Sequence, residues 1–184
     1  MNKSFLTLED AKISNEFKRN GYVIRNIADK KALDYIQSKF VKLIKKNYKF
    51  KKSYSNEKIF NLIHKKIKKN QLNDFRLKII NQINKDENCR YSYFKFTKPH
   101  LEAIVGNELV MQKKINLSIQ LPEDRDSLLP VHSDVWSGDS PFEAVVWLPL
   151  VNCFKTKSMY ILPANLINKF KFVRLNTKFC YQNL

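Results

Sequence analysis

The stretch DKKALDYIQSKFVKLIKK, residues 29–46, repeats its apolar side chains at the spacing of an amphipathic helix. These positions, three or four residues apart, are Leu33, Ile36, Phe40, Leu43 and Ile44. Asp29 stands directly before them, and its carboxylate can accept a hydrogen bond from the free N–H groups of a first helical turn. The stretch therefore predicts a helix that begins after Asp29 and buries one apolar stripe.

Similar stripes lie on both sides of this segment. Toward the N-terminus, apolar residues between Phe5 and Phe17 predict a short helix that ends at Asn20-Gly21, where glycine suits a left-handed C-cap. Toward the C-terminus, Ser55 or Asn56 begins a helix with isoleucines at steps of four, and a further stripe runs from Leu72 to Ile83. Residues 1–88 are thus expected to be mainly helical.

The second half of the chain changes period. Ile115, Leu117, Ile119 and Leu121 alternate with Asn116, Ser118 and Gln120, which is typical of a strand with one buried face. Extended pieces are also expected at 90–96, 142–149 and 158–163, separated by turns rich in Gly, Ser and Pro. Short strands at this spacing predict an antiparallel sandwich or barrel over residues 89–163. The fold class expected is α+β, with N-terminal helices packed on β-strands.

Composition sets the class of protein. The chain has 184 residues, of which 43% are hydrophobic, enough for a single domain with its own core. No apolar run reaches the roughly 18 residues of a membrane span, and Glu9 and Asp10 interrupt the N-terminus before a signal peptide could form. Three cysteines without a CxxC pair favour neither a disulfide framework nor a zinc site. A soluble, cytoplasmic protein is expected.

The formal net charge of +17 is unevenly distributed. Residues 39–85 carry 15 basic and two acidic side chains, whereas residues 121–150 carry one basic and six acidic side chains. Lysines between apolar stripes are ordinarily the solvated faces of amphipathic helices. The same segment also interleaves Tyr48, Phe50, Tyr54 and Phe60, a pattern that can hold phosphates and stack bases. An alternative function is therefore a basic, non-catalytic binding protein for nucleic acid or an anionic glycan.

His132 and Asp134 form the one motif that indicates metal chemistry. They are two residues apart, so on an extended strand both side chains leave the same face. An imidazole and a carboxylate that converge in this way are two members of the 2-His-1-carboxylate triad, which holds Fe(II) and leaves positions open for a co-substrate and oxygen.

The sequence around this pair resembles a known family. The segments NGYVI (20–24), YSYFKF (91–96), INLSIQLP (115–122), HSDVW (132–136), EAVVWLPL (143–150) and KSMYILP (157–163) are similar to those of Fe(II)- and 2-oxoglutarate-dependent oxygenases. Within these enzymes the likeness is to the phytanoyl-CoA-dioxygenase-like branch, and in particular to the oxygenases of sporadic carbohydrate gene clusters. It extends from about Phe5 to Pro163.

The resemblance implies a double-stranded β-helix, or jelly roll, with iron bound by His132 and Asp134. Oxidative decarboxylation of 2-oxoglutarate would then drive hydroxylation of a carbohydrate-related or other small metabolite used in cell-surface polysaccharide synthesis. Asn116, Ser118 and Gln120 would point into the barrel and contact the co-substrate. Trp147, with Trp136, would form a wall of the pocket.

The chain departs from the family's pattern after Asp134. The family has a distal His followed by Arg or Lys, but no His follows Asp134 here, and His64 and His100 both precede it. His64 is expected on a solvated lysine face and His100 at a helix start. Residues 164–184 form a basic tail without a recognisable motif. A fragment, a frameshifted gene or a truncation would each explain this departure, and a degenerate, non-catalytic relative is a third possible function. Whether the chain is an active enzyme stays open at this point.

Overall fold

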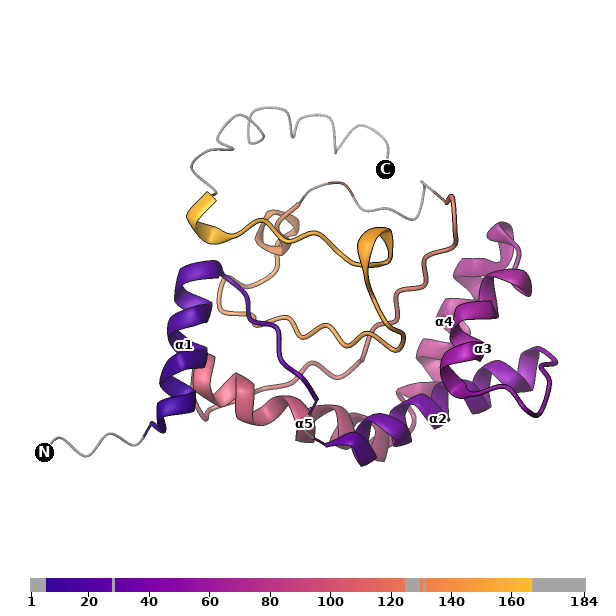
Figure 1. The fold of residues 1–184 in the computed structure, drawn as a ribbon, viewed down its shortest axis with the longest axis horizontal. Helices are drawn as coiled ribbons and strands as arrows, with labels where there is room; N and C mark the ends of the chain where they lie inside the picture. Colours follow the sequence, from indigo (N-terminus) through magenta and orange to yellow (C-terminus); the bar gives the residue numbers. More distant parts are fainter. Residues whose placement is uncertain (1–5, 28, 125–129, 131, 167–184) are drawn as a thin grey trace, which may run out of the picture.

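A computed structural model of the chain describes residues 6–27, 29–124, 130 and 132–166 (Figure 1). The α-helices of this part are α1 (Leu8–Asn20), α2 (Lys30–Asn47), α3 (Asn56–Leu62), α4 (Leu72–Ile83) and α5 (Glu87–Val105). Short 3₁₀ turns are η1 (Ile63–Lys65), η2 (Lys69–Gln71), η4 (Asp134–Ser137) and η5 (Lys155–Lys157). In Figure 1 the helices form one bent layer, and the described segments after α5, residues 106–124 and 132–166, wind over the side that α1 and α4 flank.

The helix boundaries follow the capping residues. The Asp29 carboxylate accepts a hydrogen bond from the Ala32 N–H at 3.0 Å, and the Ser55 hydroxyl accepts one from the Lys58 N–H at 3.2 Å. Gly21 ends α1 with φ of +81°, a left-handed conformation that costs glycine little. The predicted start after Asp29, the start at Ser55 and the stop at Gly21 are confirmed.

The core lies where α2, α3 and α4 meet the start of α5. Its side chains are less than one-tenth exposed, and they include Cys89 of α5 together with members of the isoleucine and phenylalanine stripes: Ile36, Phe40, Ile44, Ile59, Phe75, Ile79 and Ile83. Each helix contributes one stripe because its apolar residues recur every three or four positions. The thiol of Cys89 is only 1% exposed, and burial raises its pKa to about 11, so it behaves as a small apolar core residue.

Helix α5 replaces a predicted strand. The aromatic segment 90–96 was expected to be extended, but it lies inside α5, which runs through Pro99 to Val105. Asp86 caps this helix by accepting a hydrogen bond from the Cys89 N–H at 3.2 Å. A proline inside a helix removes one backbone hydrogen bond. Packing of α5 against both α1 and α2 offsets this cost and overrides the β-propensity of the aromatics.

The predicted α+β fold with a double-stranded β-helix, or jelly roll, is wrong. Residues 6–27, 29–124, 130 and 132–166 contain no β-strand. Residues 115–121 do alternate as expected, with Leu117, Ile119 and Leu121 packed against the helical core and Asn116, Ser118 and Gln120 exposed. The segments expected as strands at 142–149 and 158–163 are irregular as well. The alternation therefore serves to cover a helical layer rather than to build a barrel.

Helix side chains take over hydrogen bonds that a neighbouring strand would make. The Asn84 amide donates to the Ile115 carbonyl at 2.9 Å, and its oxygen accepts from the Ile115 N–H at 2.7 Å. The Tyr93 hydroxyl donates to the Val146 carbonyl at 2.6 Å, and the Gln37 amide donates to the Leu150 carbonyl at 3.3 Å. Buried backbone groups need partners, and these side chains tie the extended segments to α2, α4 and α5.

The outer faces of the helices are strongly basic. Every lysine between residues 42 and 85 is exposed, whereas the isoleucines of the same helices are buried. In the described ranges, no helix combines the length and the apolar character needed to cross a bilayer. Most of the basic tail, including Cys180, lies outside the described residues.

Asp86 joins α5 to α2, so its removal should destabilise the fold in a pH-dependent way. Its carboxylate lies 2.6 Å from the Lys39 ammonium, accepts from the Tyr35 hydroxyl at 3.2 Å and caps α5. We expect Asp86→Ala to lower the free energy of unfolding at pH 7 by about 1–2 kcal/mol. Urea unfolding measures this change, and Asp34→Ala, at an exposed position of α2, is the control.

The pH dependence follows from the carboxylate. Its hydrogen bond with Lys39 lowers the pKa of Asp86 below the ordinary value of 3.8. A carboxyl whose pKa is lower in the folded state stabilises the fold above its unfolded pKa, and this contribution is lost as the pH falls through the folded value. The difference between wild type and Asp86→Ala should therefore shrink below about pH 3.8. A difference that is constant from pH 7 to pH 2 would contradict this assignment.

Candidate functional site

A tight turn holds His132 and Asp134. Ser133 is extended, with φ of −120° and ψ of 137°, and Asp134 opens the 3₁₀ turn η4. The Trp136 N–H donates to the Ser133 carbonyl at 2.8 Å, and the Asp139 N–H donates to the Asp134 carbonyl at 3.3 Å. Gly138 closes the turn with φ of +98°, a conformation that favours glycine. The pair thus lies at the start of a 3₁₀ turn and not on the predicted strand.

The side chains of the pair converge. Nε2 of His132 lies 3.5 Å from Oδ1 of Asp134. Nδ1 of His132 lies 2.7 Å from the Pro130 carbonyl, and since a carbonyl oxygen can only accept, Nδ1 carries the hydrogen. In the neutral ring this leaves the lone pair of Nε2 for a ligand. Metal-binding histidines commonly have this arrangement, because the second hydrogen bond orients the ring.

The spacing fits two ligands of one divalent ion. Two donor atoms at about 2.1 Å from an ion are about 3.0–3.4 Å apart at ligand angles of 90–110°. The observed 3.5 Å is close to this range. Both side chains are accessible, with 41% and 51% of their surfaces exposed. Without a metal, an exposed pair of this kind contributes little to stability.

A three-residue metal site is not formed by the described residues. Within 6–27, 29–124, 130 and 132–166, no group of three or more His, Cys, Asp or Glu side chains gathers closely enough to hold a metal. His64 lies in η1 and His100 inside α5, where its Nδ1 atom is buried and has no hydrogen-bond partner among the described residues. The expected position of His100 at a helix start is therefore wrong. The described residues fit a two-ligand site and not a complete 2-His-1-carboxylate triad.

The predicted co-substrate residues do not line an interior. Asn116, Ser118 and Gln120 point to solvent, because the apolar residues between them face the helices. Trp147 is 45% exposed and Trp136 is 40% exposed. The barrel that would have brought these side chains around His132 is not present among the described residues.

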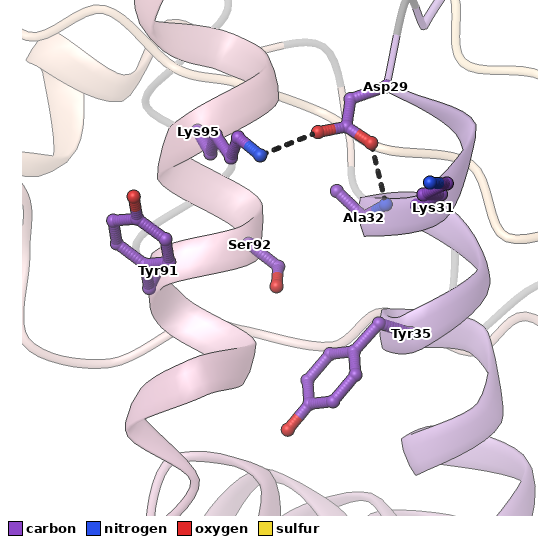
Figure 2. A pocket seen from close by; sticks show the side chains of 7 residues that line it. All are labelled: Asp29, Lys31, Ala32, Tyr35, Tyr91, Ser92 and Lys95. Carbon is purple, nitrogen blue, oxygen red and sulfur yellow. Dashed lines mark hydrogen bonds and ion pairs between the residues drawn. The ribbon is translucent and has the colours of Figure 1, made fainter.

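A hollow between α2 and α5 is a second candidate site (Figure 2). Its volume is about 260 Å³. Residues at the start of α2 line one side, namely Asp29, Lys31, Ala32 and Tyr35. The middle of α5 lines the other side with Tyr91, Ser92 and Lys95. On each helix a lysine and a tyrosine are four residues apart, so they share a face.

Ion pairing organises this hollow. The Lys95 ammonium lies 3.2 Å from Oδ2 of Asp29, while Oδ1 accepts from the Ala32 N–H; both interactions are drawn as dashed lines in Figure 2. The backbone hydrogen bond from Ala32, followed by the contact with Lys95, lowers the pKa of Asp29. Sequence reasoning missed this site because its halves are some 60 positions apart. The matching lysine–tyrosine spacings were the available signal.

Comparison with known proteins finds no relative of this chain. No family model matches the chain, and neither a curated protein nor a solved structure matches it. The resemblance to the oxygenases therefore rests on the sequence blocks around His132, Trp147 and Ile161.

Proposed function

We propose that the chain is an Fe(II)- and 2-oxoglutarate-dependent dioxygenase of the hydroxylase type, with His132 and Asp134 as metal ligands. The substrate class is a carbohydrate-related or other small metabolite. The observation that carries the proposal is the 3.5 Å approach of His132 Nε2 to Asp134 Oδ1, with the ring oriented by the Pro130 carbonyl. The HSDVW and WLPL segments support the same class of chemistry.

Each residue of the pair has a defined task in this proposal. His132 offers a neutral nitrogen lone pair, and the hydrogen bond from Nδ1 to Pro130 limits rotation of the ring. Asp134 offers a carboxylate oxygen and balances part of the metal's charge. Bound iron and 2-oxoglutarate would supply the oxidising chemistry. Because the pair provides only two protein ligands, other coordination positions stay open for co-substrate and solvent.

Metal binding tests the proposal. Titration with Mn²⁺, followed by electron paramagnetic resonance, should detect one binding site in wild type. We expect the affinity of this site for Mn²⁺ to fall by roughly ten-fold or more in Asp134→Asn, because the substitution removes one charged ligand. Asp139→Asn is the matched control, because Asp139 is an exposed carboxylate five residues further along the chain. Equal Mn²⁺ affinity in Asp134→Asn and Asp139→Asn would contradict the assignment of Asp134 as a metal ligand.

Turnover tests the reaction. With Fe(II) and 2-oxoglutarate added, wild type and Asp139→Asn should form succinate, whereas Asp134→Asn should not. Absence of succinate from the wild-type reaction, or equal formation of succinate by Asp134→Asn and Asp139→Asn, would overturn the proposed oxygenase activity.

A second candidate function is binding of a polyanion by the basic helical surface. The observation that favours it is that every lysine between residues 42 and 85 is exposed, while Glu57 and Asp74 are the only acidic residues of that segment. The Lys58 ammonium lies 4.4 Å from the centre of the Tyr54 ring, and that of Lys66 lies 5.9 Å from the Phe50 ring. These lysines offer positive charge to nucleic acid or an anionic glycan, whereas Tyr54 and Phe50 are partly buried against the helical core and leave only part of each ring accessible.

A further inference from the structure

We propose that the hollow between α2 and α5 binds a small phosphate ester, a phosphate monoester of a polyol. This site is separate from His132 and Asp134 in sequence and does not depend on the oxygenase proposal. The charges of the hollow, its hydroxyl groups and its size fit such a ligand.

The charges of the hollow favour a single anionic group. Asp29 is the only acidic side chain in its lining, and both of its oxygens are engaged, one by Lys95 and one by the Ala32 N–H. This pairing holds the Lys95 ammonium at the rim of the space between the helices, as Figure 2 shows. Lys31 has no carboxylate partner among the described residues. One net positive charge therefore faces the hollow, and the first turn of α2 adds the partial positive charge of a helix N-terminus.

The hydroxyl groups add hydrogen-bond donors. Ser92 projects into the space between the two helices (Figure 2), and its hydroxyl has no partner within the described part of the chain. The Tyr35 hydroxyl donates its hydrogen to Asp86, so it offers a lone pair and the edge of its ring. Tyr91 is 64% exposed at the opposite rim. Two ammonium groups and a free serine suit phosphate oxygens, whereas the tyrosines suit the carbon skeleton and hydroxyls of a polyol.

The size of the hollow limits the ligand. Its volume of about 260 Å³ corresponds to about nine water molecules at about 30 Å³ each. A pentose phosphate fits this space, whereas a dinucleotide does not. The net charge of +17 would also attract such an anion toward the protein.

Calorimetric titration with ribose 5-phosphate tests the site. We expect binding to wild type, and a loss of about ten-fold in Lys31→Gln and in Ser92→Ala, the size of one charge-assisted hydrogen bond. Lys42→Gln is the matched control, because Lys42 is an exposed lysine of the same helix outside the hollow. The affinity of Lys42→Gln for ribose 5-phosphate should stay within about two-fold of the wild-type affinity, since Lys42 makes no contact with the ligand. Circular dichroism checks that each variant is folded, and neither substitution disturbs the Asp29 cap.

Four results would overturn the proposal. The first is that wild type does not bind ribose 5-phosphate at millimolar concentration, and the second is that Lys31→Gln and Lys42→Gln lose the same affinity for it. The third is that wild type binds ribose as tightly as ribose 5-phosphate, and the fourth is that it binds inorganic phosphate as tightly as ribose 5-phosphate. The second would assign the binding to overall charge alone. The third would show that the phosphate group does not contribute to binding, and the fourth would show that the polyol does not contribute.

Discussion

Ile79→Ala should lower the free energy of unfolding by about 3–4 kcal/mol, the largest stability change expected from one substitution in this chain. Ile79 is 0% exposed and lies in α4 at the centre of the core that α2, α3 and α4 share. Removing three carbons from a buried isoleucine loses their transfer free energy and leaves a cavity that neighbouring helices fill only in part. Chemical denaturation followed by far-ultraviolet circular dichroism measures the change.

The same helix provides the control. Leu77 lies two residues before Ile79 and is 44% exposed, so Leu77→Ala removes a similar number of atoms from the surface. Its effect should stay below about 0.5 kcal/mol, as for other surface changes. Equal effects of the two substitutions would contradict the orientation of α4 and the position of the core.

Binding of a single-stranded oligonucleotide should weaken by about 50-fold when salt rises from about 50 to about 200 mM, if some four phosphates are neutralised. Each phosphate contact releases condensed counterions, so the logarithm of the affinity falls linearly with the logarithm of salt concentration. The exposed lysines of α2, α3 and α4 supply enough charge for this number of contacts. Fluorescence anisotropy of a labelled oligonucleotide over a salt series measures the slope.

Two pairs of adjacent lysines locate the surface. Lys45→Gln with Lys46→Gln removes two exposed charges from the end of α2, and should reduce the salt slope by roughly one to two. Lys113→Gln with Lys114→Gln removes two exposed charges from the segment after α5 and should leave the slope unchanged. Equal slopes for both double variants, or affinity independent of salt in wild type, would remove polyanion binding by this surface.

The helical half of the fold could be predicted because its signals are local. The stripes of α2 and α4 recur every three or four residues, and Asp29, Ser55 and Gly21 mark helix ends by hydrogen bonds or backbone angles within a few positions. The closeness of His132 and Asp134 is also short-range, since only one residue separates them. Interactions of this kind need no knowledge of the rest of the chain.

The β half could not be predicted correctly, because a strand exists only with a partner. The alternation from Ile115 to Leu121 determines that one face is apolar, but not what covers that face. In the tertiary structure a helical layer covers it, and the Asn84 side chain satisfies both backbone groups of Ile115. The aromatic segment after Asp86 had strand-forming residues, yet the cap at Asp86 and packing on α1 and α2 made it a helix.

By itself, the sequence determined the helix end at Gly21, the helix starts at Asp29 and Ser55, the apolar stripes of α2 and α4, the basic character of the outer helical surface, and the nearness of His132 to Asp134. These depend on neighbours within about one helical turn. Only the tertiary structure decided that the later segments cover helices instead of pairing as strands, and that α2 and α5 together line an open hollow with Lys31 and Lys95 at its sides. Both outcomes depend on contacts between residues far apart in the chain, whose free energies no local pattern encodes.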